Sequence, residues 1–309
     1  MNKTSRRSVL ASAVAAAAAL PTLNAVAGSG AAPAAAATPP ALYDFNTELY
    51  TKAASKEGTD WVRRFRIGAP VQVTDNVRAT SVAVNSTAII APHGGGIEGG
   101  TSELCMAVAG YTPFAHNTDP ATAAVAGEPQ RDFWMFETLQ NSQPQHVTST
   151  GCDDPAALAA CANNLYAVSL HGFSDTANKA VVIGGRDERL KRNLAVALAA
   201  NGLHDQNGDT NLNVSVQLNG NDPTIDGNHP MNIVNRTRTA AGAQLEISTA
   251  LRAAMFGTWD QGVTGRMASY GKNTAANGYA EHFWNAFVTA VRQGIAHHEL
   301  GKDPLHTEA

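Results

Sequence analysis

The segment "TAIIAPHGGGIEGGTSEL", Thr87 to Leu104, joins a short apolar run to five glycines and then to a pattern typical of a helix. Glycine has no Cβ, so such a run permits tight turns and a close approach of other groups to the backbone. We predict a strand ending near His93, a compact glycine turn, and a helix from about Ser102 to Ala109. His93 and Glu98 are the only ionisable groups in the glycine run, which indicates a function for both.

The same succession of strand and helix recurs along the chain. "NLYAVSLHGF" predicts a strand ending near His171, and "AQLEIS" predicts one that runs into a helix near Ser248. "KAVVIGG" predicts a further strand, followed by a helix over about 187–200 with leucines every four residues. A last helix is expected over 279–297. This alternation predicts an α/β fold, a mainly parallel or mixed central sheet with helices on both faces.

The N-terminal residues are predicted to be an export signal rather than part of the fold. Residues 1–27 combine a basic start, an apolar centre and the small-residue site "AVA", and the adjacent Arg6 and Arg7 resemble a twin-arginine signal. A membrane anchor is the alternative, but about a dozen apolar residues fall short of the roughly 20 that a span needs. We therefore expect an Ala/Pro-rich linker at 28–40, a single α/β domain at 41–309, and a secreted, extracellular or periplasmic protein. The expected partner is the twin-arginine export machinery, with no stable membrane anchor after cleavage.

The charge of the chain excludes one class of partner and complicates another. The formal net charge is -4, and removing residues 1–40, which carry three basic residues and no acid, takes it to -7. A generic nucleic-acid binder would be basic, so nucleic acid is not an expected partner. A polyanionic ligand would need a local basic patch, for which Arg63, Arg64 and Arg66 in "WVRRFR" are candidates.

The three cysteines do not form a zinc-binding pattern. Cys152 and Cys161 lie close in sequence, and an exported protein offers them an oxidising environment in which a disulfide is one possible outcome. Cys105 is expected to be a buried small hydrophobic residue.

Polar side chains gather at the predicted strand ends. In open α/β sheets, ligands bind beyond the carboxyl ends of the strands. Five ionisable residues from four segments fall at or just past such ends: His93, Glu98, His171, Arg186 and Glu246. We therefore expect a functional site at one edge of the sheet.

Three interpretations of the glycine run compete. Gly94, Gly96 and Gly99 fit the GxGxxG dinucleotide pattern, but Glu98 would then face a pyrophosphate. "HGGG" is also typical of the oxyanion loop of esterases, yet the chain has no G-x-S-x-G nucleophile elbow. A catalytic zinc commonly takes two histidines and one carboxylate. His93, Glu98 and His171 fit this third interpretation, although each histidine taken alone is more often structural.

Three motifs in order resemble a known family. "HGGGIEGGTSEL", "SLHGF" and "NIVNRTRTAAGAQLEIS" resemble the poly-γ-glutamate hydrolases of bacteriophages and bacteria, which are related in fold to zinc carboxypeptidases. The resemblance runs from about Tyr50 to Phe256. It implies one Zn²⁺ per chain held by His93, Glu98 and His171, and a catalytic Glu246. Asn235 and Arg236 resemble the pair with which carboxypeptidases hold a substrate carboxylate, whereas the His-x4-Glu spacing differs from the carboxypeptidase His-x-x-Glu.

The expected reaction is hydrolysis of γ-glutamyl amide bonds. The substrate is expected to be an anionic γ-glutamyl polymer or peptide, with poly-γ-glutamate as the leading candidate. A guanidinium from Arg186, Arg236 or Arg238 would stabilise the oxyanion, and another would hold a substrate carboxylate. Alternatively, Arg186 pairs with the acidic residues at the start of the following helix, and Arg236 and Arg238 are solvated surface residues. Two other functions stay open: a zinc peptidase or amidase acting on cell-wall peptide stems, and a non-catalytic secreted binding protein.

Overall fold

A computed structural model describes residues 42–52, 56–69, 71–75, 80–139, 145–205, 209–220, 222–260 and 262–302, with no account of the side chains at 71–75 and 80–84. All of these residues belong to the compact unit Ala35–Ala309. The predicted export signal at 1–27, with Arg6 and Arg7, and the predicted linker at 28–40 lie outside the described residues.

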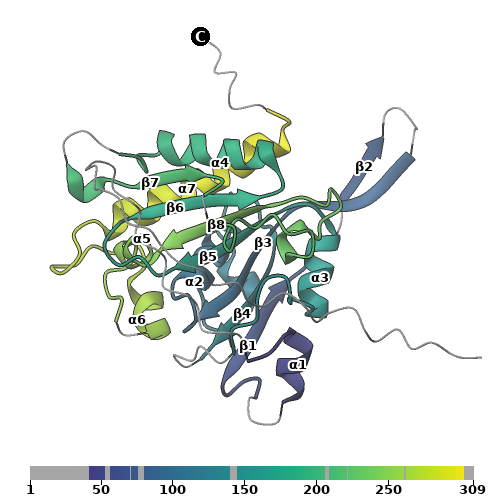
Figure 1. The fold of residues 1–309 in the computed structure, drawn as a ribbon, viewed down its shortest axis with the longest axis horizontal. Coiled ribbons are helices and arrows are strands. Elements are labelled where there is room, and N and C mark those ends of the chain that lie inside the picture. The colour runs from purple at the N-terminus through teal and green to yellow at the C-terminus, as the bar shows by residue number, and fades with distance from the viewer. Residues whose placement is uncertain are drawn as a thin grey trace, which may run out of the picture. The chain divides into compact units, whose positions relative to one another are not determined.

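A mixed β-sheet forms the centre of the fold (Figure 1). Seven strands follow one another in the order β1-β4-β3-β5-β8-β6-β7, and β2 pairs with β3 outside this path. Their bounds in chain order are β1 Trp61–Arg66, β2 Val71–Asp75, β3 Thr80–Gly95, β4 Asp132–Thr138, β5 Asn164–Phe173, β6 Ala180–Gly185, β7 Ser215–Leu218 and β8 Ala243–Ser248.

Strand direction divides the sheet into a parallel centre and two reversed flanks. β4, β3, β5 and β8 run parallel to one another, so their carboxyl ends share one edge. β1 is antiparallel to β4, and β6 is antiparallel to β8 with β7 parallel to β6. The expectation of a mainly parallel or mixed sheet is confirmed, but the carboxyl end of β6 points to the opposite edge from those of β5 and β8.

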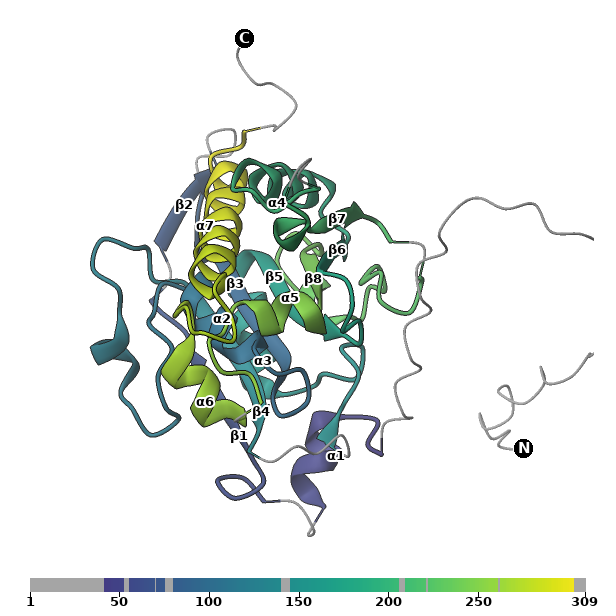
Figure 2. The same ribbon diagram turned by 90° about the vertical axis from the view of Figure 1, so that its left-hand side faces the viewer.

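Helices cover both faces, as predicted. α2 (Thr101–Val108), α4 (Glu188–Ala200), α5 (Thr249–Ala254) and α7 (Ala280–Glu299) pack on one face, whereas α1 (Asn46–Thr51) and α3 (Pro155–Ala162) pack on the other. Figure 2 shows α4 and α7 side by side. The two helices can approach closely because Gly294 of α7 has no side chain. A Cβ there would lie only 3.0 Å from the Leu194 Cα of α4.

Alternation along the central strands supplies both cores. In β3, Ile89 and Ala91 face the core under α2 and α7, while Ala88 and Ile90 face the core under α3. Such a strand is apolar on both sides, which is typical of a buried parallel strand. The remaining elements include a short helix α6 (Gly262–Ser269) and the 3-10 turns η1 (Pro120–Ala123), η3 (Thr210–Leu212) and η4 (Ile233–Asn235). No helix within the described ranges has the length and apolar character to span a bilayer.

Candidate metal centre

A cleft of about 920 Å³ opens where the carboxyl ends of β3, β5 and β8 meet. Its wall also includes the segment after β4, the loop between β7 and η4, and the segment from α5 to α6. The ionisable side chains in the wall are His93, Glu98, His146, His171, Asp222, Asp226, His229, Glu246, Arg252, Asp260 and Arg266. A cleft therefore lies at the strand-end edge where the sequence predicts a site.

The glycines that follow His93 lie so close to β4 and α2 that a side chain on them would displace atoms of these elements. A Cβ on Gly94 would lie 2.0 Å from Ser102 Oγ, and one on Gly95 would lie 2.1 Å from the Thr138 carbonyl oxygen. Gly95 also has φ +67°, a conformation that non-glycine residues seldom adopt. The glycine turn thus packs directly against β4 and α2, which fixes the positions of the two ionisable residues that flank it.

A bulge in β3 directs His93 into the cleft. Between Ala91 and Gly94, β3 carries one residue more than β4, and Pro92, which has no N–H for a ladder bond, lies in this bulge. His93 Nε2 lies 2.7 Å from the Val147 carbonyl oxygen. Because that oxygen only accepts, Nε2 carries a hydrogen, and in the neutral imidazole Nδ1 then presents its lone pair to the cleft.

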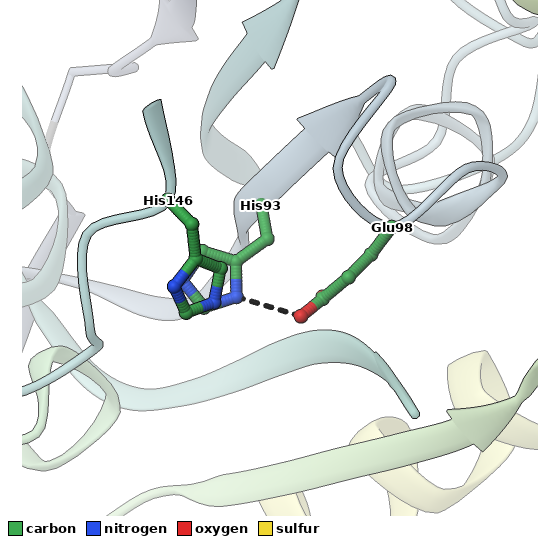
Figure 3. Close-up of side chains that lie close together, drawn as sticks. All are labelled: His93, Glu98 and His146. Carbon is green, nitrogen blue, oxygen red and sulfur yellow. Dashed lines mark hydrogen bonds and ion pairs between the residues drawn. The ribbon is translucent and has the colours of Figure 1, made fainter. Parts of the chain in front are cut away.

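Glu98 is folded back onto His93 by the turn. Its backbone N–H donates to the His93 carbonyl at 2.8 Å, and its Oε1 lies 2.8 Å from His93 Nδ1 (Figure 3). Gly172 N–H donates to Glu98 Oε2, also at 2.8 Å. Burial raises the pKa of Glu98, but the His93 and His171 imidazoles outweigh burial and hold that pKa well below its usual range.

His171 completes a cluster of three donors. Its Nδ1 lies 3.1 Å from His93 Nδ1 and 3.5 Å from Glu98 Oε2, while its Nε2 lies 3.1 Å from Ser149 Oγ. Burial lowers the pKa of His171, and its hydrogen bond and charge interaction with Glu98 raise that pKa above the usual value overall. The three residues that the sequence placed together do meet: His93 and Glu98 come from the end of β3 and the turn after it, and His171 comes from β5.

The cluster has the dimensions and the chemistry of a cation site. In the neutral imidazole, His93 Nδ1 carries no hydrogen, so its 2.8 Å contact with the ionised Glu98 carboxylate is satisfied either by a proton on Nδ1 or by a cation between the two groups. Around a tetrahedral zinc with bonds of about 2.0–2.1 Å, donor atoms lie about 3.3 Å apart. The separations of 2.8, 3.1 and 3.5 Å bracket that value, so these three residues fit zinc.

Glu246 stands beside the cluster in the next strand. It pairs in register with His171, and it alternates with Leu245 and Ile247, which face the core on the other side of the sheet. Gln244 Nε2 donates to Glu246 Oε1 at 2.8 Å, which satisfies the need for a partner in a buried position. Burial is the main reason that the pKa of Glu246 is raised to about 7, with the charge of Glu98 adding to it.

His146 is a cleft histidine that the sequence interpretation missed. Ligand atoms of His93, Glu98 and His146 all lie within 4.8 Å of one another, and the His146 ring lies against that of His93, tilted by 37° with centroids 4.1 Å apart (Figure 3). The charge that His93 carries when protonated, and then burial, lower the pKa of His146 to about 3, so its imidazole is neutral. Its Nδ1 is buried and has no hydrogen-bond partner among the described residues. Since "QPQHVTS" has no regular periodicity, only the histidine itself marked this position.

Arg252 is the second residue that was missed. From α5 its Nε donates to the Ile247 carbonyl at 3.0 Å, and its Nη1 donates to the Gly99 carbonyl at 2.6 Å. Nη2 donates to Thr249 Oγ1 at 3.0 Å. The guanidinium thereby ties the glycine turn to the end of β8. Burial lowers the pKa of Arg252 to about 10, while the nearby Glu98 and Glu246 oppose that change.

The arginines predicted to bind substrate lie elsewhere. Arg186 is exposed and outside the cleft wall, because β6 runs antiparallel to β8 and ends at the other edge of the sheet. Arg238 N–H bonds to the carbonyl of Asn164 at the start of β5, which is that same far edge. Arg236 is also absent from the cleft wall and lies near Cys161 of α3.

Asn235 has a supporting position instead of a substrate-binding one. It is buried, and its Nδ2 donates to the carbonyls of Gly227 and His229, both of which line the cleft. Its Oδ1 accepts from Gly242 N–H just before β8. Asn235 therefore holds the loop that forms one wall of the cleft.

The arginines of "WVRRFR" do not form a basic patch at the cleft. Arg63 pairs with Glu57 and Asp154, and Arg64 pairs with Glu137. Arg66 donates to the Tyr111 hydroxyl at 2.5 Å. None of the three belongs to the cleft wall.

All three cysteines are buried free thiols. Cys105 packs in the core, as expected, and Cys152 and Cys161 form no disulfide in this structure.

Comparison with known proteins identifies the family. The sequence model of the poly-gamma-glutamate hydrolases matches residues 72–118 and 115–276. The chain belongs to the poly-γ-glutamate hydrolase family.

Two curated relatives come from Bacillus subtilis (strain 168). The SPbeta prophage-derived UPF0714 protein YoqZ is 31% identical over 174 residues, which cover 55% of this chain and 52% of YoqZ. The UPF0714 protein YndL is 32% identical over 173 residues, which cover 55% of this chain and 56% of YndL. The chain thus spans little more than half the length of these relatives.

Two solved structures share the fold. A bacteriophage poly-gamma-glutamate hydrolase superposes with a TM-score of 0.59 at 25% identity, covering 85% of this chain and 100% of that one. The zinc-free apo form of YndL superposes with a TM-score of 0.55 at 25% identity, covering 82% and 98%.

Proposed function

We propose that this protein is a zinc-dependent hydrolase of γ-glutamyl amide bonds. The observation that carries the proposal is the meeting of His93 Nδ1, the Glu98 carboxylate and His171 Nδ1 at 2.8–3.5 Å in the cleft wall, beside the buried Glu246. Membership in the poly-γ-glutamate hydrolase family supports the choice of bond, and the zinc-free description of the YndL structure supports the choice of metal.

His93, Glu98 and His171 would hold the ion, one per chain. His171 is a better third ligand than His146, because Ser149 supports its remote nitrogen whereas the described residues give His146 Nδ1 no partner to orient it. Zinc bound there would lower the pKa of a water molecule from 15.7 to about 7, which supplies a nucleophile at neutral pH.

Glu246 is the proposed general base. With a pKa raised to about 7, it can take a proton from the attacking water and return it to the leaving amine. The amide C–N bond breaks, the water oxygen bonds to the carbonyl carbon, and the products are a carboxylate and an amine. No acyl-enzyme is formed.

Arg252 and Gly172 are positioning groups for this chemistry. Arg252 spans the Gly99 and Ile247 carbonyls, so it fixes the glycine turn that carries Glu98 relative to the strand that carries Glu246. Gly172 lies under its guanidinium, where a Cβ would be 2.5 Å from Arg252 Cζ. Gly172 N–H also orients Glu98. The cleft offers no free guanidinium, among the described residues, equivalent to the predicted oxyanion arginine.

The test compares wild type with Glu246→Gln on poly-γ-glutamate, with product size measured by gel filtration and zinc by atomic absorption. Wild type is expected to shorten the polymer, to stop when a chelator is added, and to recover with zinc. Glu246→Gln is expected to keep about one zinc per chain and to lose turnover by a factor on the order of 10² or more. Zinc-loaded wild type that binds ligand but never cleaves would establish a binding protein instead.

We also propose that residues 1–27 direct export by the twin-arginine route and that residues 28–40 link this signal to a single hydrolytic domain at 41–309. The adjacent Arg6 and Arg7 support the route. Replacing both by lysine is expected to block translocation, measured by fractionating producing cells. Unchanged secretion of that variant would contradict the proposal.

A further inference from the structure

We propose that Gln244 is a positioning residue for the general base, which fixes one oxygen of the Glu246 carboxylate and leaves the other as the oxygen that takes the proton from water. Asn232 in turn fixes the orientation of the Gln244 amide. This inference rests on the proposed function and deepens it, because it names the groups that orient the base.

The three side chains form a continuous hydrogen-bonded chain in the cleft wall. Asn232 Nδ2 donates to Gln244 Oε1 at 2.9 Å, and Gln244 Nε2 donates to Glu246 Oε1 at 2.8 Å. All three residues line the cleft, yet none is more than 5% exposed. Asn232 directly precedes η4, whereas Gln244 and Glu246 belong to β8. The hydrogen-bonded chain therefore joins the loop of the cleft wall to the strand that carries the base.

A backbone N–H sets the direction of these hydrogen bonds. Val234 N–H donates to the side chain of Asn232 at 3.1 Å, and a backbone N–H can only donate. The atom that it meets is therefore Oδ1, which leaves Nδ2 to face Gln244. Because Nδ2 is also only a donor, it meets Gln244 Oε1, and Gln244 presents Nε2 to Glu246. The two ends of an amide have nearly the same shape, so this succession of donors is what distinguishes them.

The surroundings of Gln244 oppose a rotation of its amide. Its Nε2 lies 3.4 Å from the Ile225 carbonyl oxygen as well as 2.8 Å from Glu246 Oε1, so both neighbours of this end are acceptors. A rotated amide would place its own oxygen against these two oxygens. Gly227 packs on the side chain, where a Cβ would lie 2.9 Å from Gln244 Cβ and 3.1 Å from Gln244 Cδ. Gln244 is therefore held in one orientation by both packing and hydrogen bonding.

This orientation gives the two oxygens of Glu246 different roles. Gln244 Nε2 can only donate, so a hydrogen on Glu246 Oε1 would weaken their bond, whereas a hydrogen on Oε2 leaves it intact. No described residue donates to Oε2, and Oε2 is not one of the buried side-chain atoms without a partner, so it reaches the cleft. Glu246 Oε2 thus takes the hydrogen as the O–H bond of the attacking water breaks. It later gives this hydrogen to the nitrogen of the leaving amine.

The first test removes the donor to the base. Gln244→Leu keeps a side chain of similar size but has no N–H for Glu246 Oε1. Zinc-loaded wild type and variant are compared by initial rates of amine release from poly-γ-glutamate, and zinc is measured by atomic absorption. The kcat of the variant is expected to fall about tenfold or more, because a hydrogen bond to a charged group is lost. KM and zinc content should stay within about twofold of wild type, because substrate and metal are bound by other groups.

The second test, Asn232→Asp, reverses the hydrogen bonds without changing the shape of the side chain. Aspartate caps as well as asparagine, so the bond from Val234 N–H is kept and a purely structural role would be preserved. Its second oxygen attracts the Nε2 end of Gln244, which turns the Gln244 oxygen towards Glu246. The base then meets an acceptor, and kcat is expected to fall about tenfold or more. Asn228→Asp, on an exposed residue of the same loop outside the cleft wall, is the matched control and should leave kcat unaltered.

The outcomes are distinct. Wild-type kcat in a folded Gln244→Leu or Asn232→Asp variant, while Glu246→Gln lacks turnover, overturns the inference and leaves the hydrolase proposal intact. A fall in kcat that is matched by loss of zinc, or by an equal fall in Asn228→Asp, also overturns it. Loss of the folded state in both Gln244→Leu and Asn232→Asp, seen by circular dichroism, would establish a structural role instead. Zinc-loaded wild type that does not cleave poly-γ-glutamate overturns the proposed function and this inference with it.

Discussion

Replacing Gly95 by alanine is expected to destabilise the fold much more than the same replacement at another left-handed glycine. Gly95 has φ +67°, and a Cβ there would lie 2.1 Å from the Thr138 carbonyl oxygen and 2.7 Å from the Thr138 nitrogen. Both are backbone atoms of β4, so no side chain can rotate away. The only relief is a separation of β3 from β4 at the glycine turn.

Two costs add at this position. Holding an L-residue in the left-handed region costs roughly 1–2 kcal/mol. Forcing an extra carbon against a packed strand costs typically about 1–3 kcal/mol more. The Gly96 N–H, which lies 3.1 Å from the Thr138 carbonyl, also loses its geometry when the strands separate. The free energy of unfolding should therefore fall by roughly 2–5 kcal/mol, or roughly 5–15 °C in Tm for a domain of this size.

Gly127→Ala is the matched control. Gly127 has φ +81°, but a Cβ there would meet nothing within 4 Å, so only the conformational cost of roughly 1–2 kcal/mol remains. Both variants are unfolded with urea and with heat in the presence of a chelator, and then titrated with zinc. Gly95→Ala should also bind zinc more weakly, because His93 and Glu98 flank the disturbed turn. Equal losses of stability in the two variants would refute the steric argument.

Two further predictions concern the metal cluster and the pH dependence of stability. His171→Ala is expected to lose zinc, whereas His146→Ala should keep about one zinc per chain, measured by atomic absorption. The reverse result would show that His146, and not His171, is the third ligand. In metal-free protein, burial raises the pKa of Glu246 from 4.5 to about 7, so its protonated form stabilises the fold at low pH and that contribution is lost as pH rises through this interval. Glu246→Gln does not titrate and should therefore gain up to about 3 kcal/mol on wild type between pH 4.5 and 7.5, measured by urea unfolding with chelator present. A difference in stability that stays constant with pH would contradict this reasoning.

Local sequence patterns predicted most of the central strands and the helices that pack on them. The strands β5 and β8 and the helices α2, α4, α5 and α7 lie within a few residues of their predicted bounds, because apolar alternation and glycine turns are local signals. β1, β2, β4, β7 and α3 were not predicted. Strand direction is not a local property, so nothing in "KAVVIGG" revealed that β6 runs against β8. That single reversal removed Arg186 from the site.

The residues of the candidate site likewise divide into those that local patterns predicted and those that they did not. His93, Glu98, His171 and Glu246 each follow or belong to a strand that the sequence reveals, so their convergence was predictable. His146 comes from an irregular segment, and Arg252 reaches the glycine turn from a position 153 residues later in the chain. Arg252 bonds to the Ile247 and Gly99 carbonyls because of how α5 packs on the sheet. The spacing of residues along the sequence does not reveal such packing.

Scaffold and specificity rest on different parts of the chain. The proposed ligands and Glu246 are fixed by the pairing of β3, β5 and β8 and by a glycine turn with no spare room, so they tolerate little change. Asp222, Asp226 and Asp260 lie on connecting segments, which vary more freely than the elements they join. A family scaffold can therefore keep its metal chemistry while the charge of its outer wall changes. For that reason, family membership argues for the type of bond cleaved, and the connecting segments are where one member of the family can differ from another.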